Sequence, residues 1–482
     1  MILLSEVAKA VNGQLLGEDL GAGIGADVEL QSVGSDSRNI VKNQLFIAIK
    51  GEHFDGNTFA SDAIKLGAAA VLVSDANTQA RPALVVKDTR LALGALAKHW
   101  RKQFALPLVA VTGSNGKTTV KEMIVAILKA ADKSVLATQG NLNNDIGMPM
   151  TLLNLHKKHD VAVIEMGMSH LGEIAYLTRI AQPTIALINN AGTAHIGELG
   201  SRENIAKAKG EIFAGLSNDG IALINADDDY ADYWKSLNVG KTIVTFGLNM
   251  PADISAVFVE KDGLSEVQLS TPSGSVSFNL AVLGKHNISN ALAASASAVA
   301  LGVSNADIAR GLSNMQAVYG RLQRKAGFNG AVLIDDSYNA NPDSMKAAID
   351  VLAAQSASQQ TSTIFVMGDM AELGENAPQM HADIGLYAKQ KGIGQFFTFG
   401  DLSVKASQAF GVQGLDKGAQ HFSSLESLVD TLKAQMKQGV TVLVKGSRFM
   451  QMERVIKEIL GKEMVSNQLL EQKQEREKTQ CC

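Results

Sequence analysis

One short stretch limits the fold of this chain more than any other, because an apolar run leads into a glycine-rich turn and then a helical pattern. The run 106–113, LPLVAVTG, has the unbroken apolar character of a strand buried on both faces of a parallel sheet. After the turn GSNGKTT, apolar residues recur at helical spacing: Val120, Met123, Ile124, Ile127 and Leu128. A buried strand, a tight turn and an amphipathic helix in this order predict a parallel α/β sheet.

Three blocks of alternating strand-like and helix-like segments predict three α/β domains. Residues 1–103 form the first block, with short apolar runs such as NQLFIAIKG and GAAAVLVS. Residues 104–318 hold the turn and the strand candidates VAVIEMG, TIALINN, GIALINADD and KTIVTFG. Residues 319–462 repeat the alternation with GAVLIDDS, STIFVMGDM, GQFFTFG and GVTVLVKGS, which predicts a Rossmann-like sheet.

Two segments depart from this alternation. Residues 253–283 carry turn signals every few residues and predict an antiparallel edge on the central sheet. Residues 463–482 are polar and charged, which predicts a frayed helix or a disordered tail.

The composition narrows the class of protein and its partners. At 482 residues the chain is too long for one ordinary core, and a net charge of −4 gives no electrostatic reason to expect nucleic acid or an anionic membrane as partner. No apolar run reaches the length of a membrane span, and the start MILLSEVAKAVNG lacks the marks of a signal peptide. The only cysteines are Cys481 and Cys482, which excludes a disulfide framework and favours a cytoplasmic location. We interpret this pair as a frayed end, with lipidation or metal binding as the alternatives.

The glycine-rich turn predicts a phosphate-binding loop. Glycines let backbone N–H groups approach an anion, and the N-terminus of the following helix adds partial positive charge. Lys117 can reach the β- and γ-phosphates of ATP or GTP, and Thr118 can offer its hydroxyl to Mg²⁺. The loop is shorter than the common P-loop, because Val111 stands where the first glycine belongs. An ordinary glycine turn before a helix is the alternative. The loop comprises Gly113, Ser114, Asn115, Gly116, Lys117, Thr118 and Thr119.

Three further residues are candidates for chemistry, each with a simpler alternative. Glu165 closes an apolar strand on the edge where α/β sheets place their ligands, so it can hold Mg²⁺ or orient a nucleophile, and a solvated strand terminus is the simpler alternative. His195, in NNAGTAHIGELGS, is by itself more typical of a surface or hydrogen-bonded histidine, and Lys209 of a surface lysine on a helix. Sequence spacing alone does not bring the three together, so the residues by themselves indicate a nucleotide-dependent α/β enzyme.

Taken together, these stretches resemble the Mur ligase family, the ATP-dependent ligases that build the bacterial cell-wall peptide. TGSNGKTT is the short loop form of that family, and EMG, NNAGTAHI, AKAKGEIF, GKHNISNALAA, GRLQR and DDSYNANP follow in the family's order. The resemblance spans about residues 1–462. It implies a UDP-substrate-binding domain (1–103), a central ATP-binding P-loop domain (104–318), and a C-terminal domain (319–462) that closes on ATP and binds the second substrate.

The resemblance also implies roles for the candidate residues around ATP and Mg²⁺. Glu165 and His195 match the family's metal ligands, and Lys209, which we favour over Lys207, matches the lysine that is carbamylated in relatives. His286, Asn287 and Asn290 belong to the nucleotide motif, with the two asparagines by the adenine or the phosphates. Arg321 is expected to contact the phosphates, and Asp336 the ribose hydroxyls.

Substrate contacts follow from the same resemblance. Ser37 and Arg38 are candidates for the uracil or the pyrophosphate, and Asn143 and Asn144 for the UDP-sugar. Lys445 and Arg448, in KGSRFMQM, are candidates for a carboxylate of the incoming dipeptide, which arginine can bind with two parallel hydrogen bonds.

Within the family, NLNNDIGMPMTLL, DDSYNANPDSM, GDMAELGE and KGSRFMQME resemble the members that add D-alanyl-D-alanine to UDP-N-acetylmuramoyl-tripeptide through an acyl phosphate. We expect such an enzyme to be a monomer without membrane insertion. A diaminopimelate- or lysine-adding ligase is the alternative within the family, but its DNPR-like motif is absent. Folylpolyglutamate synthetase shares the loop, but the UDP-type first block argues against it. A regulatory nucleotide-binding protein without ligase activity is the alternative from another class, but it would not need a second metal ion held by Glu165, His195 and Lys209.

Overall fold

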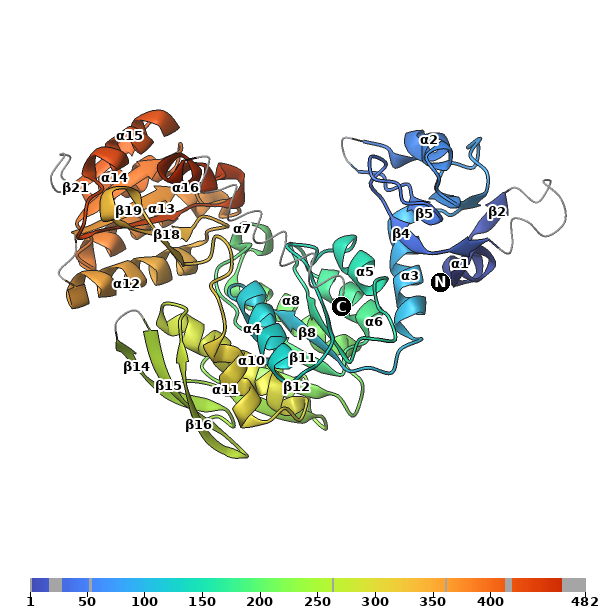
Figure 1. Ribbon diagram of the computed structural model, residues 1–482, viewed down its shortest axis with the longest axis horizontal. Helices are drawn as coiled ribbons and strands as arrows, with labels where there is room; N and C mark the ends of the chain where they lie inside the picture. Colours follow the sequence, from blue (N-terminus) through green and yellow to red (C-terminus); the bar gives the residue numbers. More distant parts are fainter. Residues whose placement is uncertain are drawn as a thin grey trace.

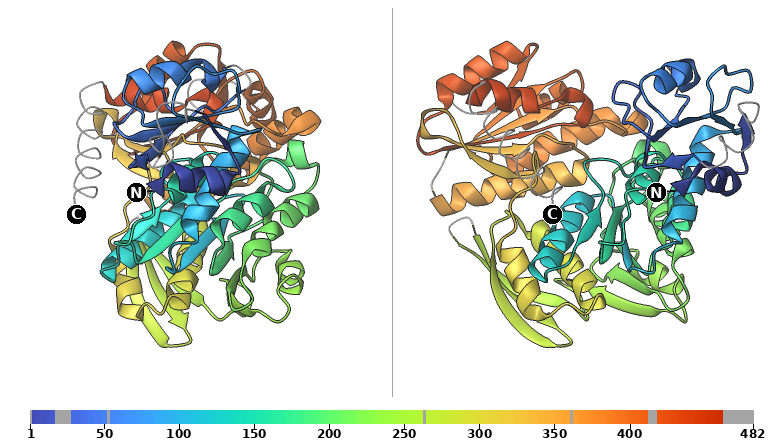
Figure 2. Two further views of the ribbon diagram at one scale, coloured as in Figure 1. Left: turned by 90° about the vertical axis from the view of Figure 1, so that its right-hand side faces the viewer. Right: turned by 45° about the vertical axis from the view of Figure 1, so that its right-hand side comes forward.

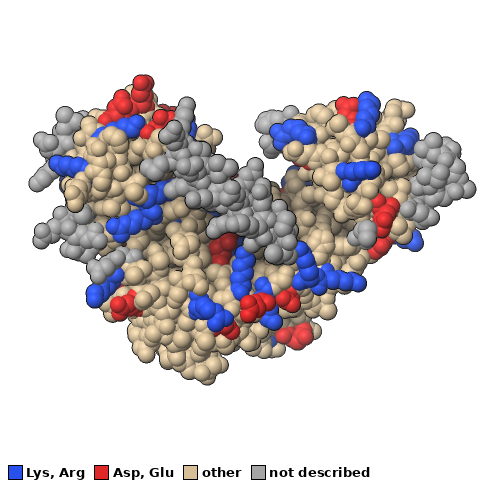
Figure 3. Space-filling view, in the orientation of Figure 1, with Lys and Arg blue, Asp and Glu red and all other residues tan. Residues whose placement is uncertain are grey.

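The computed structural model describes residues 2–16, 28–51, 54–261, 264–359, 362–411 and 418–461, with the side chains of 356–359 left aside. The predicted tail 463–482, which includes Cys481 and Cys482, lies outside the described residues. The described chain forms three lobes (Figure 1). The N-terminal and C-terminal lobes both stand on one side of the central lobe (Figure 2), and Figure 3 shows the hollow between them.

The N-terminal lobe is a five-stranded sheet in the order β2-β7-β6-β5-β4, in which only β2 runs antiparallel to its neighbour. A small antiparallel pair, β1 and β3, accompanies it. Helix α3 contributes Leu93 and Leu96 to the core of this lobe and Ala97 to the core of the central lobe, so it joins the two. The elements are β1 (Ile2–Leu3), α1 (Leu4–Val11), β2 (Gln14–Leu16), β3 (Glu29–Leu30), β4 (Ser32–Gly34), β5 (Gln44–Ile47), α2 (Ala60–Lys65), β6 (Ala70–Val73), β7 (Ala83–Val85) and α3 (Thr89–Arg101).

The central lobe is built on a six-stranded parallel sheet in the order β13-β12-β11-β8-β10-β9, as the apolar runs predict. The strand before the phosphate loop, β8, lies between β10 and β11, so the loop emerges at the middle of the sheet. The elements are β8 (Leu108–Thr112), α4 (Lys117–Ala130), β9 (Val135–Ala137), α5 (Gly147–Leu152), β10 (Val161–Glu165), α6 (Glu173–Ala181), β11 (Ile185–Ile188), α7 (Ile196–Leu199), α8 (Arg202–Gly210), β12 (Ile221–Asn225), α9 (Ala231–Ser236), β13 (Thr242–Phe246), α10 (Lys285–Ala300) and α11 (Asn305–Ser313).

The prediction for residues 253–283 was wrong in one respect. The segment is antiparallel, but β14 (Ser255–Lys261), β15 (Leu264–Thr271) and β16 (Gly274–Leu280) form a separate three-stranded sheet instead of an edge of the central one. The alternation of buried and exposed residues along β15 explains the separate sheet. Val267 and Leu269 point to one face and join the apolar core, while the residues between them are exposed on the other face.

The C-terminal lobe repeats the predicted pattern with the strand order β17-β18-β22-β19-β20-β21, in which β17 is antiparallel and the rest are parallel. Its elements are β17 (Gln323–Ala326), β18 (Val332–Asp336), α12 (Pro342–Gln359), β19 (Ser362–Gly368), α13 (Ala377–Gln390), β20 (Gln395–Phe399), α14 (Ser403–Phe410), β21 (Gly418–Phe422), α15 (Leu425–Gln435), β22 (Val440–Lys445) and α16 (Glu453–Leu460). Over the described part of the chain, no helix is both long and apolar enough to cross a membrane.

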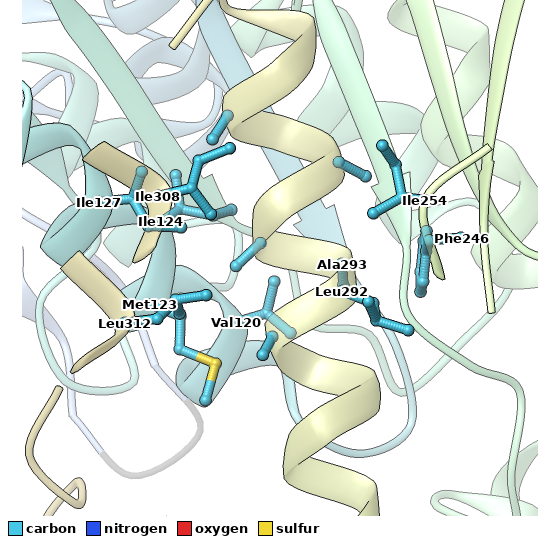
Figure 4. Close-up of a cluster of buried hydrophobic side chains, with 14 of the residues drawn as sticks. Val120, Met123, Ile124, Ile127, Phe246, Ile254, Leu292, Ala293, Ile308 and Leu312 are labelled. Atoms are coloured by element: carbon cyan, nitrogen blue, oxygen red, sulfur yellow. The ribbon is translucent and has the colours of Figure 1, made fainter. Parts of the chain in front are cut away.

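The predicted apolar stripe of α4 is the centre of one core of the central lobe. Val120, Met123, Ile124 and Ile127 are fully buried, and they face α10 and α11 (Figure 4). The helix that begins in the phosphate loop is therefore fixed along its whole length by apolar packing. This packing gives the loop a rigid base.

Replacing Ile124 by alanine tests this base. We expect the Ile124→Ala variant to lose about 2–5 kcal/mol of unfolding free energy, because a buried aliphatic side chain leaves a cavity. Val257→Ala, at a position that is 67% exposed, is the control and should change stability by less than about 0.5 kcal/mol. Urea unfolding followed by tryptophan fluorescence reports on this lobe, since Trp234 is buried in it. Equal stability of the two variants would contradict the packing argument.

Candidate active site

A cleft of about 1200 Å³ lies where the three lobes meet. It is lined by most of the residues that sequence reasoning selected. These are Ser114, Asn115, Gly116, Lys117, Thr118, Thr119, Asn143, Asn144, Glu165, His195, His286, Asn287, Asn290, Arg321, Asp336 and Lys445. Residues separated by more than 300 positions in the chain therefore share one cavity.

The phosphate loop is held in place by the turn at Gly116 and by three asparagines around it, Asn189, Asn190 and Asn290. Gly116 has φ of +81°, and a Cβ there would lie 2.3 Å from Oδ1 of Asn290 and 2.5 Å from Nδ2 of Asn189. Only glycine fits such a turn. Asn190 Oδ1 accepts a hydrogen bond from the Asn115 N–H at 2.9 Å, and its side-chain amide donates back to the Asn115 carbonyl. The loop is therefore rigid without the first glycine of the common P-loop.

Lys117 folds back into this loop. Its Nζ donates to the Gly113 carbonyl at 2.8 Å. Burial lowers the pKa of Lys117 from its ordinary value, while the nearby Glu165 and Glu372 carboxylates oppose this shift. The ammonium is thus placed beside the helix N-terminus, where it can move onto a bound phosphate.

Thr118 and Glu165 meet at the ends of neighbouring parallel strands. Glu165 ends β10 in register with Val111 of β8, and Thr118 Oγ1 donates to Glu165 Oε2 at 2.9 Å. The other carboxylate oxygen of the buried Glu165 accepts from Asn143 Nδ2 at 2.7 Å. Glu165 is therefore held by two side chains and is not a solvated strand terminus. Asn144 Oδ1, in contrast, accepts a hydrogen bond from the N–H of Gly147, the first residue of α5, at 2.9 Å.

His195 lies across the cleft, at the start of α7, with φ of +63°. Its Nδ1 is 2.7 Å from Oε2 of Glu372, a residue of the C-terminal lobe. The two atoms are in close contact, although the ring N–H does not point straight at that oxygen. The two side chains are 24% and 47% exposed.

The two lysines of α8 differ sharply. Lys207 is exposed and paired with Glu203 at 2.6 Å, which raises the pKa of the lysine. Lys209 is buried, and among the described residues no side chain or carbonyl forms a hydrogen bond or ion pair with its Nζ. Burial lowers its pKa well below the ordinary value, and the charge of Lys117 lowers it further. Lys209 does not line the cleft, but it is close enough to Lys117 to respond to its charge.

The nucleotide motif at the start of α10 is a chain of buried amides. Asn290 Nδ2 donates to Asn287 Oδ1, Asn290 Oδ1 accepts from Asn189 Nδ2, and Asn287 Nδ2 donates to the Leu283 carbonyl. Both asparagines of the motif are about 4% exposed. Burial lowers the pKa of the adjoining His286 to about 4, so this imidazole is neutral near pH 7.

The C-terminal lobe contacts the phosphate loop directly. Arg321 Nη2 donates to Thr118 Oγ1 at 2.9 Å, and its guanidinium lies over the Tyr338 ring. Asn341 Nδ2 donates to Asn115 Oδ1 at 2.8 Å, and Asp343 Oδ2 accepts from both the N–H and the hydroxyl of Thr193. The two lobes are therefore in contact around the loop.

Asp336 and Lys445 form a buried ion pair in which Nζ and Oδ2 are 2.7 Å apart. Burial raises the pKa of Asp336, and Lys445 opposes that shift. Arg448 lies outside the cleft, exposed, at 3.2 Å from Glu453. The structure thus brings Lys445 to the predicted nucleotide side and leaves Arg448 apart from it.

The first lobe's predicted residues also lie apart from the cleft. Ser37 and Arg38 are not among its lining residues, and the exposed Arg38 is paired with Asp36 at 2.8 Å. The N-terminal lobe instead contributes Arg90 and Leu91, at the start of α3, to the cleft wall. Arg90 is 2.6 Å from Asp145 of the central lobe.

Several residues of the site were not selected from the sequence. Asn341, Asp343 and Glu372 all cross from the C-terminal lobe to the central one. They lie in DDSYNANPDSM and GDMAELGE, stretches that carry the family resemblance, so the motif marked the region without giving a role to each side chain. Asn190 likewise lies within NNAGTAHI.

The donor set fits Mg²⁺ bound together with phosphates better than a metal caged by protein alone. Within the described ranges, no three His, Cys, Asp or Glu side chains gather as metal ligands. Thr118 and Glu165 nevertheless put a hydroxyl and a carboxylate 2.9 Å apart at the loop. Mg²⁺ commonly takes one or two protein oxygens and completes its shell with water and nucleotide phosphates.

The chain matches known proteins over nearly its whole length. Family models described as "Mur ligase family, catalytic domain", "Mur ligase middle domain" and "Mur ligase, glutamate ligase domain" match residues 29–101, 111–298 and 320–448. The UDP-N-acetylmuramoyl-tripeptide--D-alanyl-D-alanine ligase of Escherichia coli K12 is 43% identical over 95% of this chain and 98% of its own length. The enzyme of that name from Bacillus subtilis is 36% identical over 89% and 93%.

Solved structures of enzymes named MurF have a similar three-dimensional structure. A crystal structure of MurF from Acinetobacter baumannii superposes with a TM-score of 0.86 at 36% identity, covering 95% of this chain and 98% of that one. MurF ligase from Thermotoga maritima in complex with ADP gives a TM-score of 0.79 at 27% identity, covering 91% and 98%.

The left-handed turn at Gly116 provides a test of the loop. A Gly116→Ala variant would strain the turn by about 1–2 kcal/mol and would also collide with Asn189 and Asn290. We expect nucleotide affinity, measured by calorimetry, to fall by roughly tenfold or more, since about 1.4 kcal/mol corresponds to tenfold. Gly140→Ala is the matched control, because Gly140 also has a positive φ of +54° but open space around it. Unchanged affinity in the Gly116 variant would show that the loop does not bind the nucleotide.

Proposed function

The chain belongs to the Mur ligase family, and from that premise we propose that it joins D-alanyl-D-alanine to UDP-N-acetylmuramoyl-tripeptide with the hydrolysis of ATP. Relatives of that name cover nearly the whole chain at up to 43% identity. The observation that supports the proposal most directly is the convergence of Lys117, Glu165 and Arg321 around Thr118 at the mouth of the loop. Two cationic side chains and a carboxylate around one hydroxyl suit phosphoryl transfer, which needs positive charge and a metal ion near the phosphates.

The reaction needs an activated carboxyl group. A carboxylate is a poor electrophile and cannot expel O²⁻, so the γ-phosphoryl group is transferred to it first and gives an acyl phosphate. The amine of D-alanyl-D-alanine then attacks, and the tetrahedral intermediate expels phosphate. In this scheme Lys117 and Arg321, together with the N-terminus of α4, neutralise charge on the phosphoryl group during transfer.

Mg²⁺ fits the donors present in two places. Thr118 and Glu165 would hold an ion shared with the ATP phosphates, and His195 with carbamylated Lys209 would hold a second one by the substrate carboxylate. Bound there, the ions would supply positive charge to the reacting oxygens. His195 is accessible from the cleft, and Lys209 lies close enough to Lys117 for the two charges to interact, which supports these assignments.

The remaining roles concern the nucleotide and the substrates. Asn287 and Asn290 are proposed to contact ATP, and Asp336 the ribose. Asp336 is already paired with Lys445. To bind the ribose, its carboxylate must either contact the ribose and Lys445 together or release Lys445, which would then turn towards the dipeptide carboxylate. Arg448, close to the Tyr338 ring, is proposed to help bind that carboxylate.

For the other substrate, we propose that Ser37 and Arg38 bind the UDP moiety and that Asn143 and Asn144 contact its sugar. The two asparagines line the cleft, which supports their role. We further propose that the C-terminal lobe closes over the acyl phosphate and keeps water out. The contacts of Arg321, Asn341 and Asp343 with the central lobe are the ones that an opening would break. A monomeric enzyme acting in the cytoplasm completes the proposal.

Phosphate release from ATP tests the function. With UDP-N-acetylmuramoyl-tripeptide present, release should depend on D-alanyl-D-alanine and yield the pentapeptide product, detected by mass spectrometry. Single amino acids should give no product. Release with diaminopimelate or lysine on the dipeptide precursor would instead assign the preceding ligase step, and release with neither would overturn the proposed substrates.

Carbamylation of Lys209 is a separate prediction. Only a neutral amine reacts with CO₂, and the lowered pKa of Lys209 increases the neutral fraction near pH 7. With ¹³C-bicarbonate we expect one carbamate signal in the NMR spectrum, lost in Lys209→Met and kept in Lys207→Met. Ligase activity should fall by about 10–100-fold or more in the first variant only. A signal that survives Lys209→Met would contradict the assignment.

A further inference from the structure

The contact between Glu372 and His195 crosses the boundary between the C-terminal and central lobes. We propose that Glu372 is a positioning residue for His195, so that the C-terminal lobe supplies the carboxylate that orients a metal ligand of the central lobe. The inference rests on the proposed function for the metal role of His195. It goes beyond that function, because it makes this ligand dependent on the contact between two domains.

The distance between the two groups fixes the tautomer of the imidazole. Oε2 of Glu372 lies 2.7 Å from Nδ1 of His195, which is within reach of a proton on that nitrogen. An unprotonated Nδ1 would direct its lone pair at an anionic oxygen 2.7 Å away, which is repulsive. The proton of the neutral ring therefore lies on Nδ1, and the lone pair of Nε2 is free for a metal ion. Metal-bound histidines commonly have such a carboxylate on the other ring nitrogen.

The backbones of both segments are shaped for this approach. His195 and Glu372 have φ of +63° and +61°, in the left-handed region that residues other than glycine seldom adopt. The Gly197 N–H donates to the Glu372 carbonyl at 2.9 Å. A Cβ at Gly197 would lie 2.5 Å from the backbone nitrogen of Gly374 and 2.8 Å from the Glu372 carbonyl oxygen. Only glycine at position 197 lets the two lobes come this close.

Side chains of the C-terminal lobe form hydrogen bonds with the backbone just before Glu372. His381 is fully buried, its Nε2 accepts from the Met370 N–H at 2.9 Å, and its Nδ1 lies 2.7 Å from the Ala377 carbonyl. Ser447 Oγ accepts from the Ala371 N–H at 2.8 Å. The residues just before Glu372 are therefore anchored on both sides. A side chain on such a base can fix the orientation of its partner.

A consequence follows for metal binding. If Glu372 orients His195 only when the lobes touch, metal binding at His195 and contact between the lobes favour each other by the same free energy. Glu372 does not contact the Thr118–Glu165 pair, and its negative charge lies near Lys117. Removing it should leave nucleotide binding unchanged or slightly tighter.

The test uses Glu372→Ala, with Glu375→Ala as the matched control, since Glu375 is exposed on the same loop. We expect the Mg²⁺ concentration for half-maximal ligase activity to rise by about 10–100-fold in Glu372→Ala, the range typical for loss of a residue that orients a metal ligand. ADP affinity by calorimetry should stay within about twofold, which loss of fold or of the loop would not allow. Glu375→Ala should match the unsubstituted enzyme in both measurements.

A spectroscopic measurement tests the positioning without any catalysis. Long-range ¹H–¹⁵N spectra of histidine-labelled protein, with His195 assigned by its loss in His195→Gln, should show the proton on Nδ1. In Glu372→Ala the proton of His195 should move from Nδ1 towards Nε2. Gly197→Ala should produce the same shift by separating the lobes, while Glu198→Ala, on the exposed side of α7, should not.

The outcomes separate the two proposals. A proton on Nε2 in the unsubstituted protein, or unchanged spectra and Mg²⁺ dependence in Glu372→Ala, would overturn the positioning role even if the ligase activity is confirmed. Absence of ligase activity with the proposed substrates would overturn the proposed function, while the spectra would still decide whether Glu372 orients His195.

Discussion

The left-handed turn at Gly116 is the constraint on which the rest of the site depends. It brings the N-terminus of α4 against Asn189 and Asn290, and the fully buried stripe of α4 prevents the helix from yielding. Thr118 is therefore a fixed point, and both Glu165 and Arg321 are placed by their hydrogen bonds to its hydroxyl. A loop one glycine short of the common form is rigid here because Asn190 supplies bonds that the loop's own backbone lacks.

The contacts between the C-terminal and central lobes have a common character. Arg321, Asn341, Asp343 and Glu372 each cross the boundary with a polar group, and each meets a residue of the phosphate loop or of the 193–197 segment. Polar contacts of this kind exchange readily with water and so cost little to break. They also meet the residues to which the proposed function assigns phosphate and metal binding, which suits the proposed opening and closing of this lobe.

Sequence reasoning reached the parts of this structure that local patterns determine. The alternation of buried strands and helices predicted both parallel sheets, and the stripe from Val120 to Leu128 predicted the buried face of α4. It placed Glu165 at the sheet edge beside the loop, where it lies. It missed β9, which is only three residues long, and β21, whose sequence GAQHF has no unbroken apolar run. It also attached β14–β16 to the wrong sheet. Contacts such as Asn115–Asn341 span 226 residues, and no local period fixes which side chains meet across such a distance.

The surroundings of Lys209 suit the carbamylation that we propose for it. Burial favours the neutral amine of Lys209 and the charge of Lys117 favours it further, while the Asp228 carboxylate opposes this shift without cancelling it. A carbamate on Lys209 would reverse the sign of that interaction, because the repulsion between two lysines would become an attraction between an anion and a cation. The same neighbour would therefore promote the neutral amine before the proposed carbamylation and stabilise the anion afterwards. Lys207, two residues away, is exposed and paired with Glu203, so Lys209 is the better candidate of the two for the proposed metal ligand.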